Sequence, residues 1–286
     1  MNFNSNLANV LEVKNLFYVF AKSANVKMPT RFLACQEGLY TDSNNALCFD
    51  KAVAYISDMG DCFAKPSICT DSGNGCHIYR LVGGIDKISE KSSKEVLKEL
   101  GLNFVLQERI KCHESIRNIY SGSVNTFRVM IYRWHDNVFS APVIMRIGRG
   151  AFLDNAHAGG MFIAISEEGI LHEKVFTEFN ESFFKHPDSS LIFDGYKIDK
   201  LPEVVETVKK MHYLLQSIGV INWDMTIDEN GTPTLIEANV NCGSIWLFQM
   251  AHECGVFGGR TQEILQWICK TDKLNYGERI KHHFGD

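Results

Sequence analysis

Hydrophobic and polar residues alternate through the segment INWDMTIDENGTPTLIEANVN, residues 221–241. Apolar residues take the odd positions from 221 to 227, and polar residues take the even positions. After Asn230-Gly231 the alternation resumes at residues 236–241. A period of two predicts half-buried strands, and Asn-Gly is a strong signal for a short hairpin turn. The segment is therefore predicted to be a β-hairpin.

The register of this hairpin decides which polar side chains meet. A turn centred on Asn230-Gly231 places Asp224 opposite Glu237 and Asn222 opposite Asn239. All four then lie on one face, and the other face belongs to the core. Pro233 could shift the pairing by one residue, which would send Glu237 to the other face.

Two opposed carboxylates need an explanation. Side chains paired across strands have Cβ atoms roughly 4.5–5.5 Å apart, so like charges repel there. A hard divalent cation would reverse that effect, because such ions bind carboxylate and amide oxygens. We interpret the hairpin as a magnesium clamp. The alternative is a solvated face on which two acids happen to be opposed.

Periodicity along the rest of the chain predicts a mixture of helices and strands. Further strands are expected at residues 29–35, 61–66, 77–82, 103–110, 125–134, 137–148, 159–166 and 170–176. Helices are expected at residues 7–20, 50–56, 92–100, 202–218, 244–253 and 260–268. The helices are segregated from runs of strands that suit antiparallel pairing, so the predicted class is α+β.

Composition narrows the function. The 286 residues are 45% hydrophobic and 22% charged, as in ordinary globular proteins. A net charge of −5 without a basic run argues against nucleic acid as the main partner. The chain opens without a signal peptide and holds no apolar stretch long enough to span a bilayer. Nine scattered cysteines without a C-x-x-C pair predict reduced thiols in the cytoplasm.

A glycine-rich loop follows a lysine at the end of a predicted strand. The segment KPSICTDSGNGCHI begins at Lys65 and contains Gly73 and Gly75. Small residues allow the backbone to approach phosphate oxygens closely. The loop is not a Walker A motif, and glycine loops between strands are common, so an ordinary connection is the alternative.

Arginines are concentrated between residues 125 and 150. Arg128 and Arg133 lie on one predicted strand, and RIGRG (Arg146, Arg149) leads into DNAHAGG. This density suits recognition of an anionic group by bidentate arginine. Solvation of exposed strand faces is the alternative.

Five segments together resemble an ATP-grasp enzyme of the sugar-transfer-associated group. They are FAKPS…SGNGCHI, FVLQERI, SVNTFRVMIY, RIGRGAFLDNAHAGGM and INWDMTIDENGTPTLIEANVNCG, and they follow one another in family order. The resemblance implies two α+β subdomains that hold ATP between them. It implies a reduced amino-terminal region at residues 1–60, a small subdomain at 61–110 and a carboxy-terminal subdomain with the metal site at 111–286.

The resemblance also assigns candidate roles. Lys65 and, with less similarity, Lys14 would contact phosphates beside Gly73 and Gly75, while Gln107, Glu108 and Ile110 would lie along adenine. Glu237 and Asn239 match the family's E-x-N metal pair, and Asp224 matches the acid thirteen residues earlier. Asp154 and Asn155 would bind substrate.

One departure from the family pattern affects the phosphate site. Many ATP-grasp ligases have an arginine two positions before the first metal acid, where this chain has Asn222. Arg128 is the expected replacement.

The resulting expectation is an ATP- and magnesium-dependent carboxylate–amine ligase that works through an acyl phosphate. Arg128, Arg146 and Arg149 would be catalytic, and the acid would be a small sugar acid or a glycan-linked carboxylate of cell-surface polysaccharide biosynthesis. The partners would be ATP, that carboxylate and an amine. A kinase with the same fold and a non-catalytic nucleotide-binding accessory protein are the alternatives.

Overall fold

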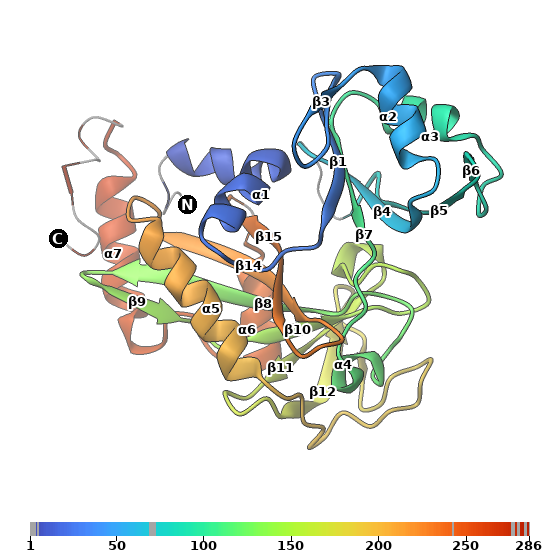
Figure 1. The fold of residues 1–286 in the computed structure, drawn as a ribbon. Helices are drawn as coiled ribbons and strands as arrows, with labels where there is room; N and C mark the ends of the chain where they lie inside the picture. Colours follow the sequence, from blue (N-terminus) through green and yellow to red (C-terminus); the bar gives the residue numbers. More distant parts are fainter. Residues whose placement is uncertain are drawn as a thin grey trace. The chain divides into compact units, whose positions relative to one another are not determined.

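The computed structural model describes residue 4, residues 6–68, 73–241 and 243–275, and residues 278, 281, 282 and 285. The chain divides into two compact units. The larger unit contains Met1–Glu12, Ser23–Lys27 and Lys111–Asp286, and the smaller contains Val13–Lys22 and Met28–Ile110. Figure 1 shows a separate sheet in each unit. The expected division at residues 60 and 110 stays a prediction.

The smaller unit is built on an antiparallel sheet. Its described strands follow the order β3-β2-β1-β7-β4-β5-β6. They are β1 (Arg31–Gln36), β2 (Leu39–Thr41), β3 (Ala46–Leu47), β4 (Gly60–Pro66), β5 (His77–Val82), β6 (Ile85–Asp86) and β7 (Phe104–Glu108). The helices are α1 (Lys14–Ser23), α2 (Phe49–Ile56) and α3 (Ser93–Leu100). Ile56 of α2 and Leu97 of α3 are fully buried with Leu33 and Phe104 of the sheet, which makes one core.

The α3 helix shows how local sequence sets an element boundary. Ser92 accepts a hydrogen bond from the Glu95 backbone, and the Glu95 side chain accepts one from the Ser92 backbone. This capping box satisfies two backbone donors that the first helical turn leaves unpaired. The helix therefore begins where the sequence predicted.

The larger unit is built on a second antiparallel sheet, in the order β13-β12-β11-β10-β8-β14-β15, with β9 paired to β8. Its strands are β8 (Thr126–Trp134), β9 (Asn137–Ser140), β10 (Ile144–Ile147), β11 (Met161–Ile165), β12 (Leu171–Thr177), β13 (Ser182–Phe183), β14 (Val220–Ile227) and β15 (Pro233–Asn239). Its helices are η1 (Asn6–Glu12), α4 (Glu114–Arg117), η2 (Ala156–Ala158), α5 (Leu201–Leu214), α6 (Ile245–His252), η3 (Gly258–Arg260) and α7 (Thr261–Thr271).

Helices cover both faces of this sheet (Figure 1). The α5 helix lies against β8, β9, β14 and β15, and α6 lies against β10, β11 and β12. Met130 and Ile144 of the sheet share a buried cluster with Phe248 of α6 and Trp267 of α7. Consequently every residue of β8 is buried, and so is β14 from Ile221 to Ile227. The expectation that β14 is half-buried was wrong.

The mixed α+β class is confirmed, and most predicted elements are present with boundaries shifted by a few residues. The expected helix at residues 7–20 is instead the short η1 followed by α1. The expected strand at residues 137–148 is divided into β9 and β10, because Pro142 cannot donate a ladder hydrogen bond. In the part of the chain that the structure describes, no helix combines the length and apolar character needed to cross a membrane.

Candidate functional site

The acidic hairpin has the predicted register at its acids. Asp224 of β14 is paired with Glu237 of β15, and Asn222 is paired with Asn239. Nearer the turn the pairing shifts by one residue, so that Met225 lies opposite Leu235. A β-bulge between these two regions absorbs the extra residue of β15.

The turn itself differs from the prediction. Asp228 and Thr232 close the loop through a backbone hydrogen bond of 3.0 Å, so the loop comprises residues 229–231 rather than the Asn-Gly pair alone. The Asp228 carboxylate accepts hydrogen bonds from the backbones of Asn230 and Thr232, and Gly231 takes the left-handed conformation at φ 75°. The longer turn shifts the register, and the bulge restores it before Glu237.

A third strand brings an arginine to the same row. Arg128 of β8 is the direct partner of Asp224 on the side opposite Glu237. Arg128 Nε donates to Asp224 Oδ1 at 2.9 Å, and Nη2 donates to Oδ2 at 2.8 Å. Both side chains are buried, and Asp224 is fully inaccessible. The hairpin alone suggested two opposed acids without a counter-charge. In the structure, Arg128 supplies that counter-charge to Asp224.

Arg146 of β10 ties a second acid to this pair. Its Nη2 lies 3.2 Å from Asp224 Oδ2 and 3.3 Å from Asp154 Oδ1. Its Nε donates to Thr126 Oγ1 at 3.0 Å, and its Nη1 donates to Asn155 Oδ1 at 3.0 Å. Thr126 in turn donates to Asp154 Oδ2 at 2.5 Å. Arg146 thus joins Asp154 and Asn155 of its own motif to Asp224 of the hairpin motif.

The electrostatics of the cluster follow from these contacts. Burial alone would raise the pKa of Asp224, but the charges of Arg128 and Arg146 and the hydrogen bonds from Arg128 lower it to about 2. Burial raises the pKa of Asp154 above its usual range despite Arg146 and Thr126. Two buried guanidinium groups therefore balance two buried carboxyl groups, and Asp224 is held ionised.

Glu237 and Asn239 present the oxygens most suited to a cation. Both are partly exposed, whereas Asp224 lies behind them. The Asn239 amide nitrogen donates to Asp224 Oδ2 at 3.2 Å, so the amide oxygen of Asn239 takes no part in that bond. Carboxylate and amide oxygens are the ligands that magnesium accepts. The donor set fits this ion, with Asp224 sharing its oxygens with two arginines.

No group of three or more histidine, cysteine, aspartate or glutamate side chains suited to a metal occurs within the described residues. The predicted magnesium set has two acids and one amide, so it falls outside that description.

Arg149 lies in different surroundings from Arg146. It is partly exposed and donates from Nε to the Gly159 carbonyl at 3.2 Å. Its Nη1 lies 3.4 Å from Glu181 Oε2, and its guanidinium lies 5.7 Å from the centre of the Phe183 ring. Of the three candidate arginines, Arg149 is therefore the one whose side chain is partly exposed.

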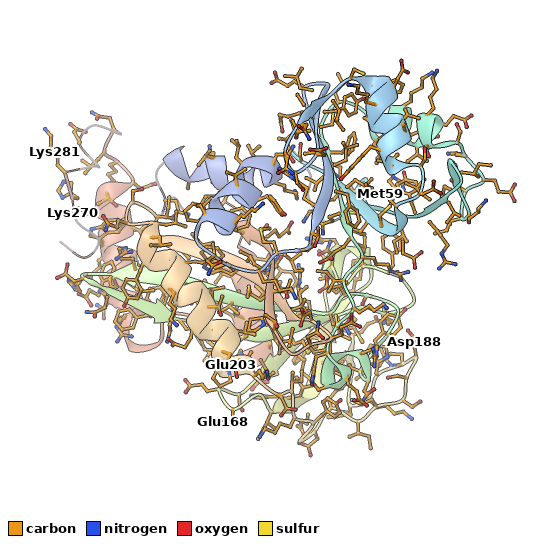
Figure 2. All side chains as sticks on the ribbon, in the orientation of Figure 1. Met59, Glu168, Asp188, Glu203, Lys270 and Lys281 are labelled. Atoms are coloured by element: carbon orange, nitrogen blue, oxygen red, sulfur yellow. The ribbon has the colours of Figure 1, made fainter. Side chains whose placement is uncertain are left out.

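The turn that carries Arg149 is held from several sides. Gly148 donates to Asn125 Oδ1 at 3.1 Å, and its carbonyl lies 2.9 Å from His186 Nε2. The Gly150 backbone donates to Asp188 Oδ2 at 2.9 Å, and Asp188 is labelled in Figure 2. Tyr120 donates to the Ala151 carbonyl at 3.2 Å. These bonds fix the turn against neighbouring loops.

The smaller unit brings the two candidate phosphate lysines together. Lys65 is buried near the end of β4, and Lys14 begins α1. The Lys14 backbone donates to the Ser67 carbonyl at 2.9 Å, so α1 starts beside the end of β4. Gly75, at φ 74°, packs against Pro66, where an added Cβ would lie 2.8 Å from Pro66 Cγ. Gly73 is described, whereas residues 69–72 of the same loop lie outside the described residues.

The candidate adenine residues lie at the end of β7. Gln107 is buried on this strand, between β1 and β4. Glu108 ends the strand, and its backbone donates to the Thr30 carbonyl at 2.9 Å. Ile110 follows, partly buried, where the smaller unit ends.

Sequence reasoning missed Thr126 as a member of the site. The structure shows its hydroxyl between Arg146 and Asp154. Its alternation with Phe127 marked only a strand. Thr126 lies two positions before Arg128, on the same strand face, and that spacing was the available signal.

Comparison with known proteins adds a family. The chain matches the sugar-transfer associated ATP-grasp family over residues 1–266. No curated protein matches it.

Two solved structures share the fold. D-alanyl-alanine synthetase A from Vibrio cholerae O1 biovar eltor str. N16961 superposes with a TM-score of 0.52 and 12% identity, over 92% of this chain and 64% of that one. N5-carboxyaminoimidazole ribonucleotide synthetase, solved with ADP, superposes with a TM-score of 0.50 and 11% identity, over 93% of this chain and 62% of that one. The chain therefore spans less than two thirds of either synthetase. Because the family match covers all but the last 20 residues, the chain belongs to the sugar-transfer associated ATP-grasp family.

Proposed function

We propose that the protein is an ATP- and magnesium-dependent carboxylate–amine ligase. One observation carries the proposal. Asp224 is aligned between Arg128 and Glu237 on three adjacent strands, with Asn239 bonded to it. A row of this kind offers oxygen ligands for a cation beside fixed positive charge, which suits a reaction that moves a phosphoryl group.

The proposed roles follow from position. Glu237 and Asn239, with Asp224 behind them, would hold magnesium. When bound, the ion would neutralise charge that develops on the β- and γ-phosphate oxygens. Lys14 and Lys65 would contact phosphates beside Gly73 and Gly75, and Gln107, Glu108 and Ile110 would line the adenine.

The reaction would proceed in two transfers. A substrate carboxylate oxygen attacks the γ-phosphorus, the bond to the β-phosphate bridging oxygen breaks, and ADP leaves. The nitrogen of an amine then attacks the acyl carbon, phosphate leaves with its oxygen, and the amine loses a proton. The chain's own residues position these groups and stabilise charge.

The arginines divide between two tasks in this scheme. Arg128 and Arg146 would keep Asp224 ionised and fixed, because Arg128 donates two hydrogen bonds to its carboxylate and Arg146 forms an ion pair with it. Arg149 would bind the carboxylate substrate, because its side chain is partly exposed, unlike those of Arg128 and Arg146. Asp154 and Asn155 would help to form the substrate-binding part of the site, through the contacts that both make with Arg146.

The family's association with sugar transfer supports a sugar acid or a glycan-linked carboxylate as the substrate, within cell-surface polysaccharide biosynthesis. We also propose a cytoplasmic location, where ATP is supplied and where the free cysteines found among the described residues would remain reduced.

The test is the release of ADP from magnesium-ATP with a panel of sugar acids, each with and without a panel of amines. A ligase releases ADP rapidly only when acid and amine are both present. ADP release that needs no amine and leaves a stable phosphorylated product would instead indicate a kinase.

A further inference from the structure

A network of four polar side chains lies inside the smaller unit, apart from the candidate magnesium site. We define the Gln36 network as Asn15, Gln36, Ser67 and Asn103. Gln36 Oε1 accepts from Asn15 Nδ2 at 3.1 Å and from Ser67 Oγ at 3.3 Å. Gln36 Nε2 donates to Asn103 Oδ1 at 2.9 Å. One amide therefore joins three separate segments of the chain.

Backbone bonds close this network into a ring. The Ser67 backbone donates to the Asn103 carbonyl at 3.1 Å, and the Glu37 backbone donates to Asn103 Oδ1 at 3.0 Å. Asn15 Nδ2 also donates to the Cys35 carbonyl at 3.2 Å. Asn15 Oδ1 is buried without a hydrogen-bond partner, so the network is satisfied at Gln36 and Asn103 but not at every atom of Asn15. Hydrogen bonds that link several segments restrict the relative positions of those segments.

Two members of the network are buried, whereas Gln36 and Asn103 are partly exposed. Ser67 is fully inaccessible, and Asn15 is more than nine-tenths buried. The hydrogen bonds from Asn15 and Ser67 to Gln36 are therefore partly shielded from water. An apolar cluster would fill the same volume without the cost of burying amides. What the polar network adds is defined geometry.

The segments that it joins carry the candidate nucleotide residues. Asn15 follows Lys14 at the start of α1, and Ser67 comes two residues after Lys65 at the end of β4. Asn103 directly precedes β7, which carries Gln107. The Lys14 backbone bond to Ser67 closes the same connection from the other side.

We propose that Gln36 is a positioning residue for nucleotide binding. Its side chain holds the beginning of α1 against the end of β4, so that Lys14 and Lys65 approach the phosphates together. Gln36 touches no nucleotide in this scheme and acts through the two lysines. The inference rests on the proposed function, because it assumes that these lysines bind phosphate.

The test uses ADP with magnesium, measured by isothermal titration on the full chain. Gln36→Met keeps the length of the side chain and removes its hydrogen bonds. The expected result is a dissociation constant for ADP raised on the order of tenfold. This is the scale of one lost hydrogen bond between a displaced lysine and a phosphate.

A matched control separates positioning from general stability. Ser92→Ala removes the capping box of α3 in the same unit, away from both lysines. Both variants should lower the melting temperature without ligand, but only Gln36→Met should weaken ADP binding. If both variants weaken ADP binding equally, Gln36 only stabilises the unit and the proposal is overturned.

A double-mutant cycle tests whether Gln36 acts through a lysine. In the Lys65→Ala background, adding Gln36→Met should raise the dissociation constant for ADP by a smaller factor than it does in the wild type, because one of the two lysines that Gln36 positions is gone. An undiminished loss in that background would overturn the inference. Should Gln36→Met fail to fold, Ser67→Ala removes a single bond of the network and should shift ADP affinity in the same direction. Unchanged affinity there also counts against the inference.

Different results would overturn the proposed function and the inference about Gln36. A wild-type protein that binds no ADP would overturn the proposed function together with this inference. If the wild type binds ADP and Gln36→Met binds it equally tightly, only the inference about Gln36 is overturned.

Discussion

Arg128 and Asp224 form a bidentate ion pair across β8 and β14, with both donor–acceptor distances below 3.0 Å and Asp224 fully inaccessible. The pair is completed by Arg146, whose Nη2 lies 3.2 Å from the same carboxylate. Asp224 therefore serves as the anchor of two buried cations before any ligand is considered. Asp224 therefore has a structural role in the buried ion pair, whereas Glu237 is partly exposed and is free of that role.

The first prediction concerns stability. Asp224→Asn should destabilise the ligand-free protein by about 3–5 kcal/mol, because it leaves two buried guanidinium groups without their carboxylate. Glu237→Gln should change the free energy of unfolding little, since Glu237 is partly exposed at the end of the row. Urea unfolding of both variants makes the comparison. Equal losses in the two variants would contradict the distinction.

The second prediction concerns pH. The folded pKa of Asp224 is about 2, below the unfolded value of about 3.9. A lowered carboxyl pKa contributes stability above the unfolded value, and this contribution is lost as pH falls through the folded value. The difference in unfolding free energy between wild type and Asp224→Asn should thus be full at pH 7 and shrink between about pH 4 and pH 2.

Asp154 also contributes to this comparison, because the charge of Asp224 is one cause of its raised pKa and the Asp224→Asn substitution removes that charge. Its raised pKa acts in the opposite direction, since ionisation of Asp154 costs stability as pH rises. A difference that stays constant down to pH 2 would show that Asp224 has no lowered pKa in the folded protein.

Much of the fold followed from local patterns. The periodicity of the β14–β15 hairpin predicted the pairing of Asp224 with Glu237, and the Ser92–Glu95 motif predicted the start of α3. The Arg128–Asp224 pair could not be predicted this way. It depends on β8 lying beside β14, a pairing between segments 96 residues apart that no local pattern specifies.

The burial of the acids was missed for a related reason. The alternation in β14 suggested a solvated polar face, but that face continues into the core formed with α6 and α7. Asp224 can be buried there because Arg128 of β8 and Arg146 of β10 neutralise its charge. Sequence alternation cannot distinguish these two environments.

The third prediction divides the arginines. Arg146→Lys should destabilise the protein and lower kcat, because lysine cannot reproduce contacts to Thr126, Asn155, Asp154 and Asp224 from one planar group. Arg149→Lys should leave stability nearly unchanged and raise KM for the carboxylate substrate. Steady-state kinetics with both co-substrates varied, beside thermal melts, checks both parts. An Arg149→Lys defect confined to KM for ATP would contradict the assignment.

The fourth prediction concerns nucleotide. Magnesium-ATP at a hundredfold excess over its dissociation constant should stabilise the wild type by about 2.7 kcal/mol. Lys65→Ala should reduce this stabilisation, because phosphate contacts are lost. Lys98→Ala, an exposed lysine of α3, is the control and should leave it unchanged. An equal thermal shift in Lys65→Ala and wild type would remove Lys65 from the nucleotide site.

The central claim is that a substrate carboxylate becomes an acyl phosphate. Hydroxylamine captures such an intermediate as a hydroxamate, so the direct measurement is hydroxamate formation with magnesium-ATP and a panel of sugar acids. The account predicts hydroxamate in a one-to-one ratio with ADP for the wild type, and neither product for Glu237→Gln, which should fold normally. ADP formed with a stable phosphorylated product and no hydroxamate would contradict it.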